Sequence, residues 1–446
     1  MFYSRTALAS FQFADNNYSP LGEERRPQNM NRLTRSPISL IAAASLTVWP
    51  FAEGSAQIGD EDDLAPTTAE SIAALASPPT VYTWSTTTTG FAWLNASHWT
   101  GNAGHFPGVD ANSNSIGDGA SNDVAAFSSM AFAASAVGIN FSPSSSDGVS
   151  TNTGANGSLT LGAIDYLSTT NKSISIGDNS GTAGTLTLTG VTLNGVANTV
   201  LANEGRNSLT LAPQIGGGTQ GMTLALRNTT NNVVQVNGTG GVTITSAIEN
   251  AAGVAARLTK TGAGTLTLSH ANTYNGGTTI RQGAVVVSNA TGSATGVGKV
   301  QVDLGILRGV GKIDGAVTVG NDSSSGATIL GGNSTSPGIL TINSALTFRS
   351  FSSYKCALNR ASVKASQVSA LGVIIGSGAT FTFVDVGTGT LPVGTVFTVI
   401  NNTSASPIAG TFSNLPNGSI FTSNGNHFKV NYTGGTGNDL TLKVVP

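Results

Sequence analysis

Charged side chains are scarce in this sequence. Its 446 residues include 20 Lys or Arg and 22 Asp or Glu, so only 9% of the chain is charged and the formal net charge is −2. A nucleic-acid-binding protein needs clustered Lys and Arg to displace counterions from phosphates, so this composition argues against a nucleic-acid partner. It also excludes a disordered polyelectrolyte, because disorder of that kind accompanies a high net charge.

Cysteine is nearly missing as well. The single residue, Cys356, cannot form a disulfide within the chain. Its neighbours Tyr354 and Leu358 are consistent with a strand, so we predict a half-buried structural thiol. A free thiol and a disulfide to a second chain are the alternatives. The sequence offers no nearby partner that would make this thiol a nucleophile.

Motifs for catalysis and metal binding are also lacking. The four histidines are scattered, without a His-x-x-x-His pair, and no serine lies in a Gly-x-Ser-x-Gly element between a strand and a helix. We therefore assign no catalytic, cofactor-binding or metal-binding residue, and expect a protein that is not an enzyme and needs no cofactor. The histidines are His98, His105, His270 and His427.

Outside the predicted signal region, no window of ten residues shows helical periodicity, so we expect little helix. The N-terminal region instead has the features of a targeting signal. We predict that residues 1–29 come from an upstream start-codon assignment and that residues 30–56 are a signal peptide. That peptide has a basic start, an apolar run at 38–48 and small residues before its end. The run is shorter than the roughly 20 residues of a transmembrane helix. We expect export, a mature chain from Gln57 and no transmembrane span in it, with an uncleaved anchor as the alternative.

Glycine and β-branched residues are what the sequence has in abundance. There are 57 Gly, which suit tight turns, while Val and Thr suit the pleated surface of strands. In the stretch 258–287, alternating strand signals are separated by Gly and Asn clusters, as in a coil of a β-solenoid.

This stretch resembles the autotransporter-associated β-strand repeat, with the pattern L-x-K-x-G-x-G-x-L-x-L followed by Y-x-G-x-T-x-I-x-x-G. Ala284 and Val285 stand where the family more often has Leu. The resemblance implies an autotransporter passenger-like, secreted or surface-exposed chain, and indicates little about chemistry. The matching residues are Leu258, Lys260, Gly262, Gly264, Leu266, Leu268, Tyr274, Gly276, Thr278, Ile280 and Gly283.

The motif Leu-Thr-Leu, or a close variant, recurs through residues 155–345. A spacing of about 20 residues fits one coil of a parallel β-solenoid, and its irregularity argues against a propeller or a leucine-rich repeat. We therefore predict an all-β, right-handed parallel β-helix over residues 142–446. The motifs begin at Leu159, Leu186, Leu209, Leu224, Val242 and Leu266.

A tryptophan-rich segment, residues 80–141, precedes this solenoid and follows an acidic, Thr- and Pro-rich linker at 57–79. It resembles the tryptophan-rich segment often found ahead of these repeats, in Asn95, Trp99, Gly101 and Pro107-Gly108. We predict that its rings form an N-terminal cap over the first coil. The alternative is an exposed platform for sugar stacking, built from Trp84, Trp93 and Trp99.

The C-terminal residues are similar to the end of the same passenger family, in Gly410-Thr411-Phe412, Leu415-Pro416-Asn417-Gly418 and the run 432–439. That family usually adds an outer-membrane β-barrel after this point. No further series of ten-residue alternating strands follows Pro446. We therefore expect a passenger-like chain without the barrel, which leaves the export and anchoring route open.

Three groups of polar residues are candidate sites. Gly434–Asp439 matches one calcium-binding nonapeptide, for which we favour a structural turn because such sites need neighbouring copies. A second group has the spacing of a calcium loop but lacks its glycine and glutamate, so calcium is the weaker interpretation. The third is a charged cluster, interpreted as solvated corner residues rather than a catalytic groove. The second group is Asp110, Asn112, Asn114 and Asp118, and the third is Asp303, Arg308, Lys312 and Asp314.

The sequence as a whole predicts a secreted or surface-exposed structural or adhesin-like stalk without catalytic activity. Its binding surfaces would be extended polar faces of Thr, Asn and Ser, and its partners extracellular polysaccharide or cell-surface components. A polysaccharide-binding or polysaccharide-degrading β-helix protein is the alternative, because parallel β-solenoids can host such activities and a fold alone does not decide function.

Overall fold

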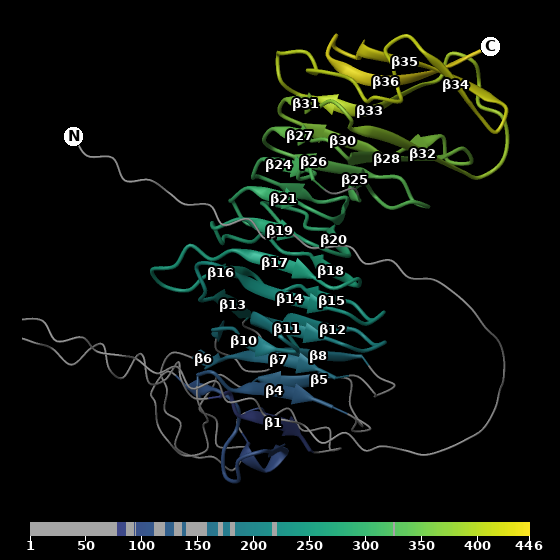
Figure 1. Cartoon of the computed structure of the whole chain (residues 1–446). Helices are drawn as coiled ribbons and strands as arrows, with labels where there is room; N and C mark the ends of the chain where they lie inside the picture. The colour runs from purple at the N-terminus through teal and green to yellow at the C-terminus, as the bar shows by residue number, and fades with distance from the viewer. Residues whose placement is uncertain are drawn as a thin grey trace, which may run out of the picture. The chain divides into compact units, whose positions relative to one another are not determined.

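The computed structural model describes residues 78–85, 93, 95–110, 121–128, 136–139, 158–167, 173–178, 183–215, 221–323 and 326–446 (Figure 1). All described residues belong to one compact unit, Pro66–Pro446. The predicted extension at 1–29, the signal peptide at 30–56 and the linker at 57–79, except residues 78 and 79, lie outside the described residues.

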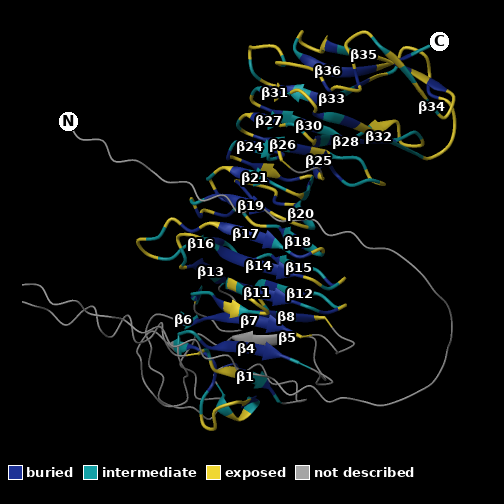
Figure 2. Ribbon diagram, in the orientation of Figure 1, coloured by how far each residue is buried: buried dark blue, intermediate teal, exposed yellow. Residues whose placement is uncertain are grey.

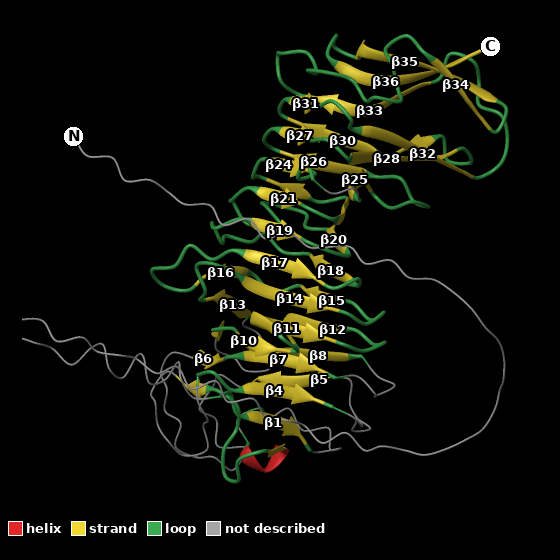
Figure 3. Cartoon of the chain, viewed as in Figure 1, coloured by secondary structure: helices red, strands yellow, loops and turns green. Residues whose placement is uncertain are grey.

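The described part of the chain is built from strands. Its one helix is a 3₁₀ turn, Ala96–His98, which Asn95 caps by accepting a hydrogen bond from the backbone N–H of Ser97 (Figure 3). Strands belong to four sheets, in which most neighbours run parallel. The all-β prediction is therefore confirmed, and so is the stacked parallel arrangement of a β-helix. Right-handed winding, the rule for parallel crossovers, stays a prediction.

The largest sheet has 13 strands. Their order is β2 (Trp99–Thr100), β1 (Val81–Trp84), β4 (Val124–Phe127), β7 (Ala163–Tyr166), β11 (Val196–Asn203), β14 (Asn232–Val236), β17 (Leu258–Thr261), β19 (Thr278–Ile280), β21 (Val300–Val302), β24 (Val317–Val319), β27 (Leu346–Phe348) and β31 (Val373–Ile375), with β10 (Val191–Leu193) beside β11.

The second sheet has 11 strands. Their order is β29 (Lys364–Ala365), β28 (Ser352–Asn359), β25 (Ala327–Gly331), β22 (Gly305–Gly309), β20 (Ala284–Val287), β18 (Thr265–Leu268), β15 (Val242–Ile244), β12 (Leu209–Gln214), β8 (Ile174–Asp178) and β5 (Ala136–Ile139), with β32 (Thr380–Val386) beside β28.

Two smaller sheets complete the fold. The 5-stranded sheet has the order β16 (Ile248–Asn250), β13 (Met222–Leu226), β9 (Gly184–Leu188), β6 (Ser158–Leu161) and β3 (Val109–Asp110). The 7-stranded sheet has the order β23 (Lys312–Ile313), β26 (Ile339–Ile342), β30 (Gln367–Ala370), β33 (Val396–Asn402), β36 (Asp439–Val445), β35 (Asn426–Gly434) and β34 (Ile420–Ser423).

The core lies between the sheets and follows the alternation of the strands. In the 11-stranded sheet, Leu209, Val242 and Leu266 pair in register and are buried, while the residues that follow each of them point outward (Figure 2). A slip of one residue would expose every one of these apolar side chains, so the Leu-Thr-Leu pattern fixes the register of the coils.

The repeat 258–287 spans two coils, and our prediction of one coil was wrong. Leu258 of β17 pairs with Thr278 of β19, and Thr265 of β18 pairs with Ala284 of β20. The stretch therefore supplies two strands to each of two successive coils. Period-2 alternation identifies a strand but carries no information about the sheet that the strand joins.

The recurring Leu-Thr-Leu motifs likewise lie in two different sheets. Leu159, Leu186 and Leu224 pair across the 5-stranded sheet, whereas the motif that begins at Leu209 belongs to the 11-stranded sheet. Coil length also varies: Val300 pairs with Val317 in the next coil, while Leu186 pairs with Leu224. The spacing between successive motifs therefore does not measure a coil, because two faces of one coil can carry the same motif.

Glycines allow successive coils to approach at their corners. Gly262 has φ 77° and Gly283 has φ 73°, a region that residues with a side chain seldom adopt. A Cβ atom on Gly283 would also collide with the backbone carbonyl oxygens of Gly262 and Gly264 in the preceding coil. Both glycines of the repeat are therefore required by the geometry of the stacked turns.

The first strands of the 13-stranded sheet come from the tryptophan-rich segment. β2 runs antiparallel to β1, but β1 and β4 pair in parallel, and β4 pairs in parallel with β7. This segment is therefore continuous with the stacked coils rather than a separate layer. Its boundaries at 80 and 141 stay predictions.

The C-terminal strands depart from the parallel arrangement. β33 pairs antiparallel with β36, β36 with β35, and β35 with β34. The sequence interpretation had continued the solenoid pattern to the end of the chain. The turn-rich stretch between Tyr432 and Leu440, flanked by two long alternating runs, is the hairpin signal that accounts for this change.

Candidate functional site

Four neighbouring strands of the 11-stranded sheet present a face of small hydroxyl side chains. Thr210 of β12 pairs with Ser175 of β8 on one side and with Thr243 of β15 on the other. Thr243 pairs in turn with Thr267 of β18, which also carries Thr265. We call these five residues the hydroxyl face. Their strands follow one another along the stack (Figure 1).

The side chains of the hydroxyl face are directed outward by the same alternation that buries their neighbours. All five are partly exposed, while the flanking Leu and Ile residues of these strands are buried (Figure 2). In the part of the chain that the structure describes, none of these five hydroxyls is hydrogen-bonded to another protein group. Each can donate one hydrogen bond and accept two, so the row is free to bind an external polar ligand.

The hydroxyl face is uncharged and has a defined extent. On β8, β12, β15 and β18, the single exposed side chain longer than threonine is Gln214, at the end of β12. Beyond Thr267 the same row continues with Val286 and then Arg308. Along the sheet, hydroxyls thus give way to an apolar and then a charged residue.

The tryptophans predicted as a cap are buried. Trp84 is 2% exposed, Trp93 0% and Trp99 5%. The ring centroids of Trp93 and Trp99 lie 4.9 Å apart, and those of Trp99 and Phe127 5.6 Å. The indole N–H of Trp99 donates to the carbonyl of Trp93 at 2.8 Å. Rings that are covered in this way cannot stack on sugar, so the platform alternative fails, whereas the cap over the first coil stays a prediction that this burial supports.

The Gly434–Asp439 segment is a hairpin turn between β35 and β36. Asp439 is buried and accepts a hydrogen bond from the backbone N–H of Asn402 at 2.9 Å. Asn438 uses its amide nitrogen to donate to the carbonyls of Asn402 and Ser404. These contacts occupy the side chains in holding two loops together, in agreement with the interpretation as a structural turn.

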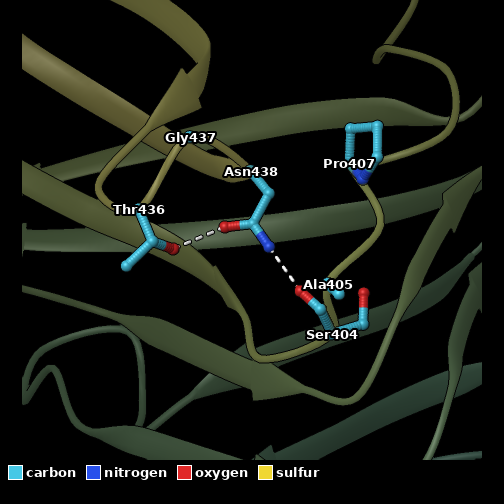
Figure 4. A pocket seen from close by; sticks show the side chains of 6 residues that line it. All are labelled: Ser404, Ala405, Pro407, Thr436, Gly437 and Asn438. Atoms are coloured by element: carbon cyan, nitrogen blue, oxygen red, sulfur yellow. Dashed lines mark hydrogen bonds between the residues drawn. The ribbon is translucent and has the colours of Figure 1, made fainter.

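A shallow hollow of about 390 Å³ lies beside this turn (Figure 4). Asn438 stands between its two walls, bonded to Thr436 on one side and to the backbone of Ser404 on the other. The lining carries no charged or aromatic group, so it offers neither acid–base chemistry nor a stacking surface. The lining residues are Ser404, Ala405, Pro407, Thr436, Gly437 and Asn438.

The predicted charged cluster does not form an ion-paired group. Lys312 and Asp314 are exposed, and Asp303 and Arg308 are partly exposed. Asp314 accepts a hydrogen bond from the Asn343 amide at 2.7 Å. Among the described residues, the ion pairs are Arg349–Asp322 and Arg360–Asp385, and neither includes a member of this cluster.

The remaining candidates are spread over the chain. Of the calcium-loop group, Asn112, Asn114, Asp118 and the side chain of Asp110 lie outside the described residues. Where the structure describes the chain, three or more His, Cys, Asp and Glu side chains nowhere gather in a way that would hold a metal ion. His270 and His427 bond only to neighbouring surface groups.

Cys356 is more deeply buried than predicted. Its exposure is 0% rather than half, because Tyr354, Cys356 and Leu358 all point into the core from β28. Burial raises the pKa of the Cys356 thiol well above its usual range. This thiol is therefore a structural residue without access to solvent. The predicted position on a strand is confirmed, and the predicted half-burial is wrong because the side chain is fully buried.

Lys260 is a buried cation that the sequence interpretation left without a role. It occupies a core position of the 13-stranded sheet, between Val234 and Ile280, and is 0% exposed. Its ammonium donates to the carbonyls of Thr261 and Gly262 at 2.7 Å and of Gln282, in the next coil, at 3.2 Å. Burial lowers the pKa of Lys260 to about 8. The lysine thus connects two coils through their carbonyl groups.

Arg360 and Asp385 form a second buried polar contact. The sequence did not indicate this contact, because the two residues are 25 positions apart. The Arg360 Nε donates to Asp385 at 2.7 Å, with side chains 9% and 3% exposed. Ser423 of β34 donates to the other oxygen of Asp385 at 2.9 Å. The pair therefore holds the C-terminal hairpin against β28 and β32.

No helix in the described ranges has the length and hydrophobicity that crossing a bilayer requires.

Comparison with known proteins finds a family match for the stretch 258–287. Residues 258–287 match the family model of the passenger-associated transport repeat. This is a passenger-like chain. It is also similar to the adhesin BmaC autotransporter of Brucella suis biovar 1 (strain 1330), with 35% identity over 149 residues. That alignment covers 32% of this chain and 4% of the adhesin, so the chain spans only a small part of the relative's length.

Proposed function

We propose that this passenger-like chain acts outside the cell, as a structural and adhesin-like surface protein without catalytic activity. The observation that carries the proposal is the passenger-associated repeat at 258–287, within stacked coils that present long uncharged faces. The named role of the similar Brucella protein, an adhesin, supports the same function. Cell-surface components or extracellular polysaccharide are the proposed partners, and nucleic acid is not.

The surface chemistry supports adhesion over polysaccharide degradation. Glycoside hydrolysis needs two carboxyl groups that flank one bond, and lyase chemistry needs acids or bases that converge in one groove. In the described residues, Asp303 and Asp314 contribute to no such groove, and the side chains of Arg360 and Asp385 serve each other. An extended surface with many weak hydrogen bonds suits adhesion, where affinity comes from many contacts at once.

Export through the predicted signal peptide is part of this proposal. If the peptide at 30–56 is cleaved, exported protein begins at Gln57, and deletion of residues 1–29 leaves export unchanged. N-terminal sequencing of exported protein tests both points. A first residue upstream of Met30 would contradict them.

Adhesion itself is tested with beads coated with the purified full chain. We expect these beads to attach to fixed epithelial monolayers in greater numbers than albumin-coated beads at equal coating density. Heat-denatured chain on the same beads is the control for nonspecific stickiness. Equal attachment of folded chain and albumin would contradict the adhesin-like function.

A further inference from the structure

We propose that Asp165, Glu204 and Gln235 bind one divalent cation, for which calcium is the best-suited ion. The three residues lie on, or directly after, the neighbouring strands β7, β11 and β14 of the 13-stranded sheet (Figure 1). Glu204 extends β11 by one residue, since its backbone N–H donates to the carbonyl of Tyr166 at 3.1 Å. This site is separate from the hydroxyl face and does not depend on the proposed adhesive function.

The register of the sheet brings the three side chains to one place on its outer face. Asp165 pairs with Ala202, and Ala202 pairs with Gln235, so only the methyl group of an alanine lies between the two polar side chains. The residues before Asp165 and Gln235 are buried in the core, so these two point outward, as does Glu204, two residues beyond Ala202. The Cα atoms of Asp165 and Gln235 are separated by two strand spacings, about 10 Å. Their side chains can span that distance together with a cation bound at about 2.4 Å from each oxygen.

Two buried oxygen atoms at this place lack a partner. Within the described part of the chain, Oδ1 of Asp165 and Oε1 of Gln235 accept no hydrogen bond, although these side chains are only 7% and 6% exposed. A buried polar group without a partner is costly, and a buried charge costs more. Because both atoms are acceptors, they cannot satisfy each other, and a donor or a cation between them is required.

The charge of the site favours a cation over a neutral donor. Burial, and after it the charge of Glu204, raises the pKa of Asp165 to about 6, which places the two carboxylates within electrostatic reach of each other. The ion pairs found among the described residues include neither of them. The Asn237 amide donates to both oxygens of Glu204, at 3.0 and 3.1 Å, but a neutral donor leaves the negative charge in place. A cation would neutralise both carboxylates at once.

A hairpin covers this part of the outer face. It consists of β10 and the start of β11, joined by a turn that begins at Asn194. Val191 of β10 packs in a small apolar cluster with Ala163, which lies two residues before Asp165 on the same side of β7. The Asn194 amide donates to Glu204 at 3.2 Å. The hairpin thus shields the outer face beside Asp165 from solvent and orients Glu204.

The ligand atoms indicate which ion fits. Two carboxylates and one amide supply only oxygen, which calcium and magnesium prefer, and the site has no His or Cys for zinc. Calcium accepts about six to eight oxygen ligands in irregular geometry and completes its shell with water, whereas magnesium demands a near-ideal octahedron. Three side chains from three different coils suit the less demanding ion. The sequence did not indicate this site, because its ligands are far apart along the chain.

The test uses the full chain, first treated with EDTA and then freed of it. Isothermal titration with calcium chloride should show one ion per chain. In denaturant unfolding, free calcium at about one hundred times the measured Kd should raise the folding equilibrium constant about a hundredfold. The variant Asp165→Asn/Glu204→Gln should bind calcium at least tenfold more weakly. In EDTA it should melt at or above the wild-type temperature, because two unneutralised carboxylates have been removed, and in calcium it should melt below wild type.

The matched control is Glu249→Gln/Asp303→Asn, which removes two partly exposed carboxylates elsewhere on the chain and should keep wild-type affinity. Gln235→Met, which keeps the length of the side chain and both carboxylates, should weaken calcium binding without lowering the melting temperature in EDTA. It also replaces the double variant if that variant does not fold. Sodium chloride at the same ionic strength should give no comparable stabilisation.

Four results would overturn the proposal. The first is an unfolding curve that is the same in EDTA and in calcium, and the second is an equal stabilisation by sodium. The third is an equal loss of calcium affinity in the control variant. The fourth is a double variant, or Gln235→Met in its place, that is destabilised as much in EDTA as in calcium, because these side chains would then have a structural role without a cation. Stabilisation by magnesium as large as that by calcium would overturn the preference for calcium.

Discussion

The two ends of the stacked coils are both filled by aromatic side chains, but different kinds of contact hold them. At the N-terminal end, Trp84, Trp93, Trp99 and Phe127 form one cluster of mostly tilted or edge-to-face rings. We call this the N-terminal aromatic cluster. Its indole N–H groups are satisfied by nearby carbonyls, that of Trp93 by Pro107 at 3.2 Å and that of Trp99 by Trp93. Covering one end therefore needs only a short segment of chain.

The C-terminal end uses more rings and contacts from more distant segments. Its aromatic cluster contains six phenylalanines and one tyrosine, linked by ring contacts from β27 to β35. The hydroxyl of Tyr354 donates to the carbonyl of Val399 at 2.6 Å, and the buried pair Arg360–Asp385 lies at the same end. The members of this C-terminal aromatic cluster are Phe348, Tyr354, Phe381, Phe383, Phe412, Phe421 and Phe428.

The difference shows how a stack of coils can be closed in two ways. Between the two clusters, the buried aromatic residues in the described chain are Tyr166 and Tyr274, and aliphatic rows fill the remaining interior. Large rings are therefore concentrated toward the two ends of the described stack of strands. The N-terminal end depends on indole packing, whereas the C-terminal end also depends on an ion pair and antiparallel hairpins.

The largest effect is expected at the N-terminal end. Trp99→Ala leaves a cavity among three rings and removes the hydrogen bond to the Trp93 carbonyl, so it should lower the free energy of unfolding by about 3–5 kcal/mol. Denaturant unfolding followed by circular dichroism measures this. Trp99→Phe, which keeps an aromatic ring, should cost clearly less. A wild-type unfolding curve for the alanine variant would show that the cluster does not stabilise this end.

The C-terminal ion pair should give the next largest effect. Asp385→Ala leaves the Arg360 guanidinium buried without its carboxylate, at a cost of about 3 kcal/mol. The double variant Arg360→Leu/Asp385→Leu removes both charges and should recover much of this loss. Thermal melts of the single and double variants decide between the two. Equal destabilisation by both would mean that packing, and not an unpaired charge, determines stability at this end.

Lys260 lies between the two ends of the stack and should make stability there depend on pH. Burial lowers its pKa to about 8 in the folded chain. The unfolded chain therefore holds this proton more tightly. A cost to the free energy of unfolding is fully present below pH 8 and disappears as the pH rises from 8 toward 10.5, by roughly 3 kcal/mol. Lys260→Met should abolish this rise. Unfolding free energies of both proteins at pH 7, 8, 9 and 10 measure the difference, and parallel pH profiles would contradict it.

The smallest effect is expected at the hairpin that joins β28 to β29. Val363 has φ 51° and is 47% exposed, so its branched side chain adds strain without burial. Val363→Gly should raise stability by about 0.5–1 kcal/mol, because glycine adopts this conformation without the steric cost. Val363→Ala keeps most of the strain and should give little gain. A melting temperature below wild type for the glycine variant would count against the strained conformation.

Local patterns in the sequence predicted strands well because alternation and burial have the same period. The strand signals at 258–287 coincide with β17, β18, β19 and β20. The burial of the three tryptophans was also predictable, since large rings close together in sequence need a common place to be buried. The expectation of extended Thr and Ser faces agrees with the hydroxyl face, but the particular rows could not be derived without the register of the coils.

Side-chain contacts between neighbouring coils could not be predicted from the sequence. Lys260 follows Leu258 by two residues, so alternation alone directs it toward the core, but its carbonyl partners in two coils follow only from the pairing of β17 with β19. Arg360 and Asp385 meet because β28 and β32 are paired over seven residue positions. The prediction that residues 258–287 form one coil was wrong because loops of different length separate strands with similar sequences.

The register of the 11-stranded sheet places outward hydroxyls of successive coils side by side. Thr243→Cys/Thr267→Cys, in a Cys356→Ala background, puts two thiols on directly paired residues, at a separation a disulfide can bridge. Thr243→Cys/Thr223→Cys is the control, because Thr223 lies in the 5-stranded sheet. Mild oxidation should join the first pair and leave the second reduced, as mass spectrometry of tryptic peptides would record. Oxidation of the control pair, or none of the first, would contradict the stacked register.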